Sequence, residues 1–171
     1  MRAKLWFAIF AVIILAAFTI AVQARAETLK GRNVLHYVKV EVIQVGDVPG
    51  HVIGVAEGRG LTFDDIKKEV GTFSNQVMFD LTNGSGTHWG YEMRTYEDGS
   101  TTVTRIQGTT TAGEGGTSSF KGTSTFIKGT GRYEGIQGGT SYTGRRLAPL
   151  TPGGPAELYA DLTGSYTVPG R

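Results

Sequence analysis

Alternation of apolar and polar residues covers most of the chain after residue 26. In residues 72–82, Phe73, Val77, Phe79 and Leu81 fall on one face, and a period of two is typical of a strand with one buried face. Almost no segment has the period of a helix. Eight such runs occur, at residues 34–45, 51–63, 72–82, 87–96, 101–111, 117–128, 135–143 and 157–168. The sequence therefore predicts an all-β fold.

Short turns join most of these runs. Asn83-Gly84 and Asp98-Gly99 are typical of tight hairpin turns, which need positive φ. Residues 64–70 form a charged loop or a helical turn, and the connection at residues 147–155 is rich in proline. Eight antiparallel strands can close into a barrel that holds side chains or one small ligand, whereas a sandwich would need Greek-key connections. We expect a single eight-stranded antiparallel, up-and-down, calycin-like barrel.

The alternation in the first predicted strand indicates which of its side chains face the core. In residues 34–45 the valines Val34, Val38, Val40 and Val42 share one face. A regular strand would turn all four toward the core.

The N-terminal segment has the layout of a secretory signal peptide. Two basic residues precede a largely apolar, uncharged run at residues 5–22, and Ala24 and Ala26 give the small residues of a cleavage site. We expect residues 1–26 to be removed and residues 27–171 to form the barrel domain of a secreted or periplasmic bacterial protein. The alternative is an uncleaved anchor, since this run approaches the length that spans a bilayer.

Removing this segment changes the charge of the chain. The full sequence has 17 basic and 15 acidic residues, and three of the basic residues lie in the segment, so 14 basic and 15 acidic residues remain. A nearly neutral domain without blocks of like charge indicates no nucleic-acid surface and, after cleavage, no membrane contact. The sequence leaves room for a homo-oligomer.

Cysteine and histidine limit the chemistry. The chain has no cysteine, so an exported domain of this size depends on its core for stability, and thiolate chemistry is excluded. The three histidines, His36, His51 and His88, lie on different predicted strands and lack metal-site spacing. We expect no metal and no cofactor.

Residues 127–144, IKGTGRYEGIQGGTSYTG, form the most distinctive stretch. Glycine at this density marks positive φ or close backbone approach, and the interleaved Tyr133, Ile136 and Tyr142 supply the large side chains. We expect a hairpin in which Tyr133 and Ile136 plug one end of the barrel and Tyr142 lies along the wall. Both tyrosines are candidate ligand-binding residues.

The string GTGRYEGIQGGTSYTG at residues 129–144 resembles the glycine-rich penultimate hairpin of the allene oxide cyclase and dirigent barrels, which carry G-T-G-(R/K)-(aromatic)-x-G-x-x-G. With VPGHVIGVAEGRGLTF, TNGSG, YEDGST and QGTTT, the chain is most similar to small exported bacterial proteins of this barrel type, a group without an assigned function. The resemblance covers residues 34–168 and implies an eight-stranded calycin-like barrel. In the plant cyclase a glutamate, asparagines and an ordered water act inside the barrel. Asn33 and Glu41 lie in the corresponding early region, but their surroundings differ, and no catalytic role is transferred to them.

Glu57 and Arg59 are the most unusual charged residues. They share a strand face with bulky apolar residues, and if that face points inward the charges must pair, because an unpaired buried charge is very costly. They would then anchor a ligand and are the candidate catalytic residues. The alternatives are a structural ion pair at a barrel end or a strand whose charges face water. Arg105 is a further ligand-binding candidate that could join Glu57 inside the barrel.

Residues 87–96 hold a second cluster. Trp89 and Tyr91 share one face, and His88, Glu92 and Arg94 share the other. If the aromatic face is internal, Trp89 and Tyr91 line a ligand site and the charges are solvated, although core packing is the commoner role of such aromatics.

Three functions fit this sequence. The first is an exported barrel that binds a small apolar or amphipathic molecule without turning it over. The second is a cyclase or isomerase that acts by confining its substrate, since proximity and preorganised charges can accelerate a reaction without a nucleophile. The third is a dirigent-like or structural assembly protein.

Overall fold

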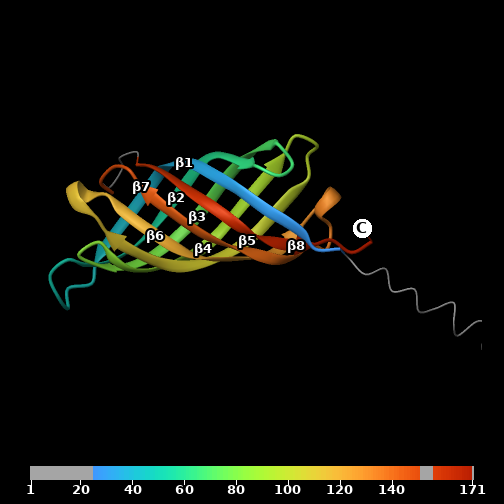
Figure 1. Cartoon of the computed structure of the whole chain (residues 1–171). Helices are drawn as coiled ribbons and strands as arrows, with labels where there is room; N and C mark the ends of the chain where they lie inside the picture. Colours follow the sequence, from blue (N-terminus) through green and yellow to red (C-terminus); the bar gives the residue numbers. More distant parts are fainter. Residues whose placement is uncertain (1–24, 151–155, 171) are drawn as a thin grey trace, which may run out of the picture.

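The structure is a computed structural model and describes residues 25–150 and 156–170. Eight antiparallel strands form one closed barrel, in which each strand pairs with its neighbours in sequence and β1 pairs with β8 (Figure 1). The strands are β1 (Glu27–Gln44), β2 (His51–Asp64), β3 (Glu69–Thr82), β4 (Ser85–Tyr96), β5 (Thr101–Ala112), β6 (Ser118–Gly129), β7 (Gln137–Arg146) and β8 (Glu157–Thr167). The predicted all-β, up-and-down barrel is confirmed, and the sandwich alternative is wrong.

The turns follow from local sequence chemistry. Asn83 and Gly84 are the two residues between β3 and β4, with φ of 50° and 78°. A two-residue hairpin turn of this kind needs positive φ at both positions, which Asn-Gly adopts readily. Between β2 and β3 the chain makes a turn rather than a helix. Asp64 Oδ1 accepts hydrogen bonds from the backbone N–H groups of Ile66 and Lys67, both at 2.8 Å.

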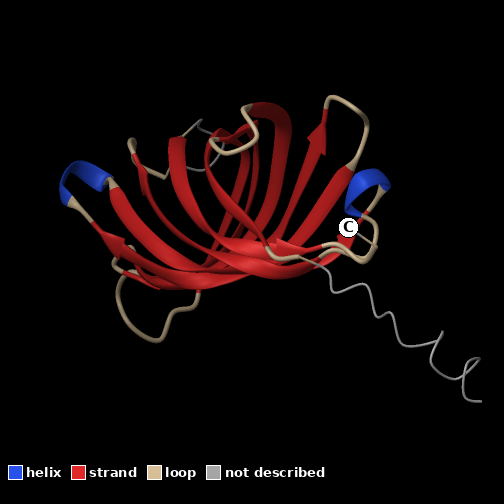
Figure 2. Ribbon diagram, turned by 45° about the vertical axis from the view of Figure 1, so that its right-hand side comes forward, coloured by secondary structure: helices blue, strands red, loops and turns tan. Residues whose placement is uncertain are grey.

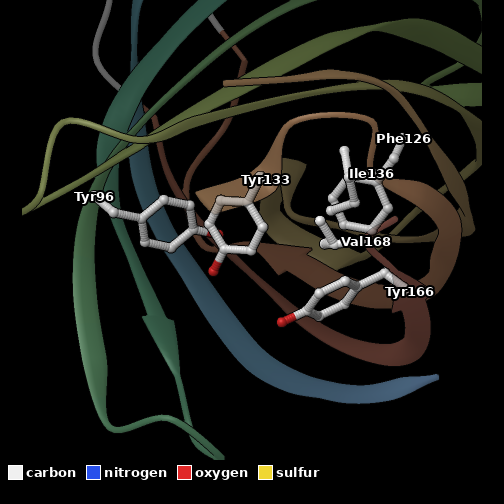
Figure 3. Packing of buried hydrophobic residues seen from close by; sticks show 6 residues of the cluster. All are labelled: Tyr96, Phe126, Tyr133, Ile136, Tyr166 and Val168. Atoms are coloured by element: carbon white, nitrogen blue, oxygen red, sulfur yellow. The ribbon is translucent and has the colours of Figure 1, made fainter. Parts of the chain in front are cut away.

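One end of the barrel is sealed by an apolar cluster, which we call the plug. Two short 3-10 helices, η1 (Glu114–Gly116) and η2 (Gly131–Tyr133), lie at opposite ends, with η2 beside the C-terminal end (Figure 2). Tyr133 from η2 packs between Tyr96 and Tyr166, at ring distances of 5.0 and 5.9 Å (Figure 3). The plug consists of Tyr96, Phe126, Tyr133, Ile136, Tyr166 and Val168.

Arg132 fastens the plug to the neighbouring turns. Its Nη1 and Nη2 atoms each donate a 2.6 Å hydrogen bond to the Glu69 carboxylate, and its guanidinium lies 4.9 Å from the ring centres of both Tyr96 and Tyr133. The bonds to Glu69 raise the pKa of Arg132 above its usual value. A bidentate ion pair stacked on two rings fixes the η2 turn over the barrel end.

A bulge in β1 changes which valines are inside. Its pairing with β2 shifts between Tyr37 and Lys39, so the alternation changes phase at Val38. Val34 and Val38 are therefore exposed, by 45% and 49%, while Val40 is buried. The expectation that Val34 and Val38 face the core is wrong, because a regular period cannot indicate a bulge.

The predicted signal peptide lies almost entirely at residues 1–24, outside the described residues. Within residues 25–150 and 156–170, no helix is long and apolar enough to cross a membrane.

Candidate functional site

A cavity of about 60 Å³ lies inside the barrel. All eight strands and the segment after β7 contribute to its walls, which are mainly apolar. The lining residues are Asn33, Leu35, Tyr37, Ala56, Phe73, Asn75, Val77, Phe79, Leu81, His88, Glu92, Ile106, Thr110, Ser118, Phe120, Tyr142, Arg146, Leu150, Leu158 and Ala160. One buried water needs roughly 10–15 Å³, so the cavity has room for several waters or a small chemical group.

The cavity adjoins a wider mouth pocket at the end of the barrel that carries η1. This mouth pocket measures about 500 Å³ and shares four lining residues with the cavity, namely Phe79, Leu81, Arg146 and Leu150. Small-molecule sites commonly occupy roughly 300–1,000 Å³. The mouth pocket and the cavity together therefore offer the space of an ordinary ligand site.

Glycines on the inner face of β2 leave room for large side chains inside the barrel. A Cβ atom at Gly54 would overlap the ring of Phe79, and one at Gly58 would overlap Leu35 and the Asn75 side chain. Large side chains from β1 and β3 thus occupy the space in front of β2. The bulky face of β2 therefore points outward.

Glu57 and Arg59 consequently lie on the outer surface. Arg59 Nη2 bonds Glu57 Oε1 at 2.6 Å, and the Arg59 side chain is 63% exposed. The condition that this face points inward is not met, and the stated alternative, a strand whose charges face water, is what the structure has. Arg105 is also exposed, opposite Tyr91 in the β4–β5 pairing, so it does not join Glu57 in an internal network. Any role of these charges in ligand binding stays a prediction.

β4 turns its polar face inward. His88, Glu92 and Arg94 are 7%, 8% and 4% exposed, whereas Trp89 and Tyr91 are 43% and 46% exposed. The expectation that the aromatic face lines the barrel is wrong, because the polar side chains find partners inside. Trp89 and Tyr91 instead border a shallow depression on the outer surface, where ligand contact by them is untested.

His88 on β4 and Tyr142 on β7 form a buried bridge inside the barrel. Its Nε2 lies 2.7 Å from Tyr142 Oη, and its Nδ1 lies 3.0 Å from Thr110 Oγ1. Gly108 and Gly122 leave the space that the bridge needs, because a Cβ on either would overlap the Tyr142 hydroxyl. Burial lowers the pKa of His88 to about 4 and raises that of Tyr142. The bridge is therefore a neutral hydrogen bond at physiological pH.

Glu92 and Arg94 form a buried ion pair. Arg94 Nη2 donates to Glu92 Oε2 at 2.9 Å, and Thr104 Oγ1 donates to the same oxygen at 3.3 Å. The guanidinium also lies 5.4 Å from the ring centre of Phe73. Since Glu92 lines the cavity, the pair places a fixed, compensated charge on the cavity wall.

Two buried amide side chains that line the cavity have polar atoms without a hydrogen-bond partner among the described residues. Asn33 is fully buried, and neither its Oδ1 nor its Nδ2 has a partner; Asn75 Oδ1 is also unpartnered. Buried polar groups are nearly always satisfied by protein, water or ligand. Asn33 and Asn75 both line the cavity, so these unsatisfied amide atoms lie beside the space that a molecule inside the barrel would occupy.

Arg146 places a second cation at the boundary between cavity and mouth pocket. Its Nε donates to the Ala148 carbonyl at 3.0 Å, and its Nη2 donates to the Gly116 carbonyl at 3.2 Å. Within residues 25–150 and 156–170, no carboxylate forms an ion pair with it. Burial lowers its pKa below the usual arginine value.

The glycine-rich hairpin has the positions expected for its large side chains. Tyr133 and Ile136 belong to the plug, and Tyr142 lines the cavity. Tyr142 is thus placed to touch a ligand, and Tyr133 lies in the sealed end. The ligand-binding role of both tyrosines stays a prediction.

In the described part of the chain, no group of three or more histidine, aspartate or glutamate residues could hold a metal ion.

No family model matches the chain, and no curated protein matches it. Among solved structures it is similar to the pterocarpan synthase dirigent protein GePTS1. The TM-score is 0.48, with 10% sequence identity over 84% of this chain and 93% of that chain. That protein belongs to one of the two families whose hairpin the sequence resembles. At this identity the similarity concerns only the path of the chain, so the interior residues are interpreted from this structure alone.

Sequence reasoning missed most polar residues of the interior. Asn75 and Arg146 each occupy an inner position of a predicted strand or its end, and Asn75 falls on the same face as Phe73 and Val77. A polar residue in an otherwise apolar strand face was the available signal for Asn75. Arg146 had no such signal, because the inner face of β7 is mostly small residues.

Proposed function

We propose that this protein is an exported barrel that binds a small amphipathic molecule in its cavity and mouth pocket without turning it over. The observation that carries the proposal is the set of unpartnered amide atoms on Asn33 and Asn75 within largely apolar walls. An apolar pocket with a few convergent polar groups is the usual form of a small-molecule site.

The size of the site agrees with this proposal. A molecule confined to the cavity would be very small, whereas one that extends past Leu150 into the mouth pocket gains about 500 Å³. A polar group of such a molecule would satisfy the amides, and its apolar part would contact side chains such as Phe73 and Val77. Export of the domain is part of the proposal and rests on the pattern of residues 1–26.

Native mass spectrometry of the protein purified from its original host tests ligand binding, supported by a thermal-shift screen with lipids and terpenoids. A bound molecule should appear with the native protein and raise its melting temperature. Ala56→Leu, which fills part of the cavity from β2, should reduce binding. Val55→Leu, at the adjacent position facing the other way, is the matched control. Retention of the ligand by a folded Ala56→Leu protein would argue against the cavity as the site.

A second candidate function is cyclisation or isomerisation of a confined substrate. It is favoured by Glu92, whose carboxylate lines the cavity and is held by Arg94 and Thr104. Incubation with an unsaturated epoxide should then give an enantiomerically enriched product, and Ala56→Leu should abolish the enrichment. A racemic product from the native protein would exclude this activity for that substrate.

The outer charges serve as controls for this activity. Glu57→Gln and Arg59→Lys lie outside the barrel, so a reaction in the cavity should be unaffected by either change. A large loss of enantiomeric enrichment in these variants would instead indicate an active site on the outer surface of β2. A stable oligomer with an unoccupied cavity, seen by light scattering and native mass spectrometry, would instead favour a dirigent-like assembly protein.

A further inference from the structure

We infer that the ligand of this barrel is an amphipathic carboxylate whose head group pairs with Arg146 at the boundary between the cavity and the mouth pocket. This inference rests on the proposed ligand-binding function and specifies the chemical class of the ligand.

The first support is the position of Arg146. The alternation of buried and exposed residues along β7 places Thr140, Tyr142, Gly144 and Arg146 on the inner face. Arg146 also lines both the cavity and the mouth pocket. A molecule that extends from one space into the other must therefore pass its guanidinium.

The second support is the charge balance of the two spaces. Among the described residues that line the cavity, Glu92 is the only acidic one, and it is bound by Arg94. The described lining of the mouth pocket contains no acidic residue, and Arg146 is its only charged group. The site thus carries one positive charge that the described part of the chain does not neutralise.

The third support is the hydrogen bonding of the guanidinium. Its two bonds go to the carbonyl oxygens of Ala148 and Gly116, which hold the side chain in place through Nε and Nη2. Nη1 makes no hydrogen bond within the described residues. A guanidinium has five N–H groups and binds carboxylates through pairs of them, so a preorganised face remains for an anion.

Partial burial of Arg146 strengthens its interaction with a bound anion. The loss of hydration that lowers the pKa of Arg146 is offset when a carboxylate binds, because charge-assisted hydrogen bonds are stronger away from bulk water. The apolar residues beside it, including Leu150 and Leu158, suit the hydrocarbon part of the same molecule. The site therefore combines an anion contact with an apolar wall.

Three probes of equal chain length test the inference: octanoate, 1-octanol and octylamine, each titrated by isothermal calorimetry against the exported protein. We expect octanoate to bind at least about tenfold more tightly than octanol, as one charge-assisted contact would give, and octylamine to bind most weakly. Equal binding of the three probes would overturn the carboxylate inference and leave the proposed function standing. Binding of none of them would overturn both.

Two matched variants locate the contact. Arg146→Gln should reduce octanoate affinity about tenfold or more and change octanol affinity by less than about twofold. Arg145→Gln removes the same charge from the adjacent, outward-facing position and should have no effect. An octanoate preference that survives in Arg146→Gln would overturn the assignment to Arg146. If that variant does not fold, the order of the three probes on the native protein still decides for or against a carboxylate ligand.

Discussion

His88 should make the stability of this barrel fall at mildly acidic pH. In the folded protein its pKa is about 4, compared with 6.5 in the unfolded chain, and the cause is burial. The unfolded chain therefore binds a proton between these two pH values that the folded chain excludes. The contribution of the neutral His88 ring to stability is fully present above pH 6.5 and is lost as the pH falls toward 4, with a limiting slope of about 1.4 kcal/mol per pH unit.

The size of the effect follows from the shift. A difference of about 2.5 pH units corresponds to about 3 kcal/mol, which is a large part of the stability of a typical domain. The structure explains why the ring stays neutral, since its two nitrogens contact the hydroxyl groups of Tyr142 and Thr110 and the edge of Phe120 packs against it. None of these partners supplies a negative charge.

Urea unfolding at pH values from 4 to 7.5 measures this effect. Glutamine at position 88 cannot be protonated. The free energy of unfolding of His88→Gln should therefore fall less steeply with decreasing pH, by the slope that corresponds to about one proton. His36→Gln, at an exposed position on β1, is the matched control and should keep the native slope. A His88 ring that titrates near 6.5 by NMR, or an unchanged slope in His88→Gln, would refute this reasoning.

Three further changes test other features of the barrel. Gly122→Ala should destabilise it by about 1–3 kcal/mol through overpacking against the Gln107 carbonyl and the Tyr142 ring. Thermal melting measures this loss, and unchanged stability would contradict the overpacking. Arg94→Met should cost about 3–5 kcal/mol in urea unfolding because it leaves Glu92 buried without its cation, and adding Glu92→Leu should recover part of this loss. His51 has a raised pKa, chiefly because of hydrogen bonds to two aspartates, so its stabilisation is full below pH 6.5 and lost as the pH rises through the raised value. His51→Gln should remove this loss, and an identical pH profile would contradict the assignment.

The period-two pattern was enough to predict the number and order of the strands. Each run ends at a turn that the chain encodes locally, as Asn83-Gly84 shows. The period-two pattern could not indicate the β1 bulge, because one extra residue in a strand leaves no mark on composition. The closed topology followed from the strand count and the short connections.

The candidate site was harder to predict because strand facing depends on the whole barrel. The alternation in β2 does not tell which of its two faces points into the barrel. Leu35 and Phe79 decide this, because they fill the space in front of the β2 glycines. In β4 the polar face is internal because Glu92 and Arg94 satisfy each other. The contacts of Leu35 with Gly58 and of His88 with Tyr142 join residues far apart in the chain, and a single sequence does not show them.

The plug gives this barrel a direction. β1 begins and β8 ends at the sealed end, where Leu29 packs against the plug and Val168 forms part of it. Any linker, affinity tag or surface attachment joined at either end of the described barrel would therefore extend from the closed side. The mouth pocket would face the opposite way, so immobilised protein should exchange its contents with solution as freely as protein that is not attached.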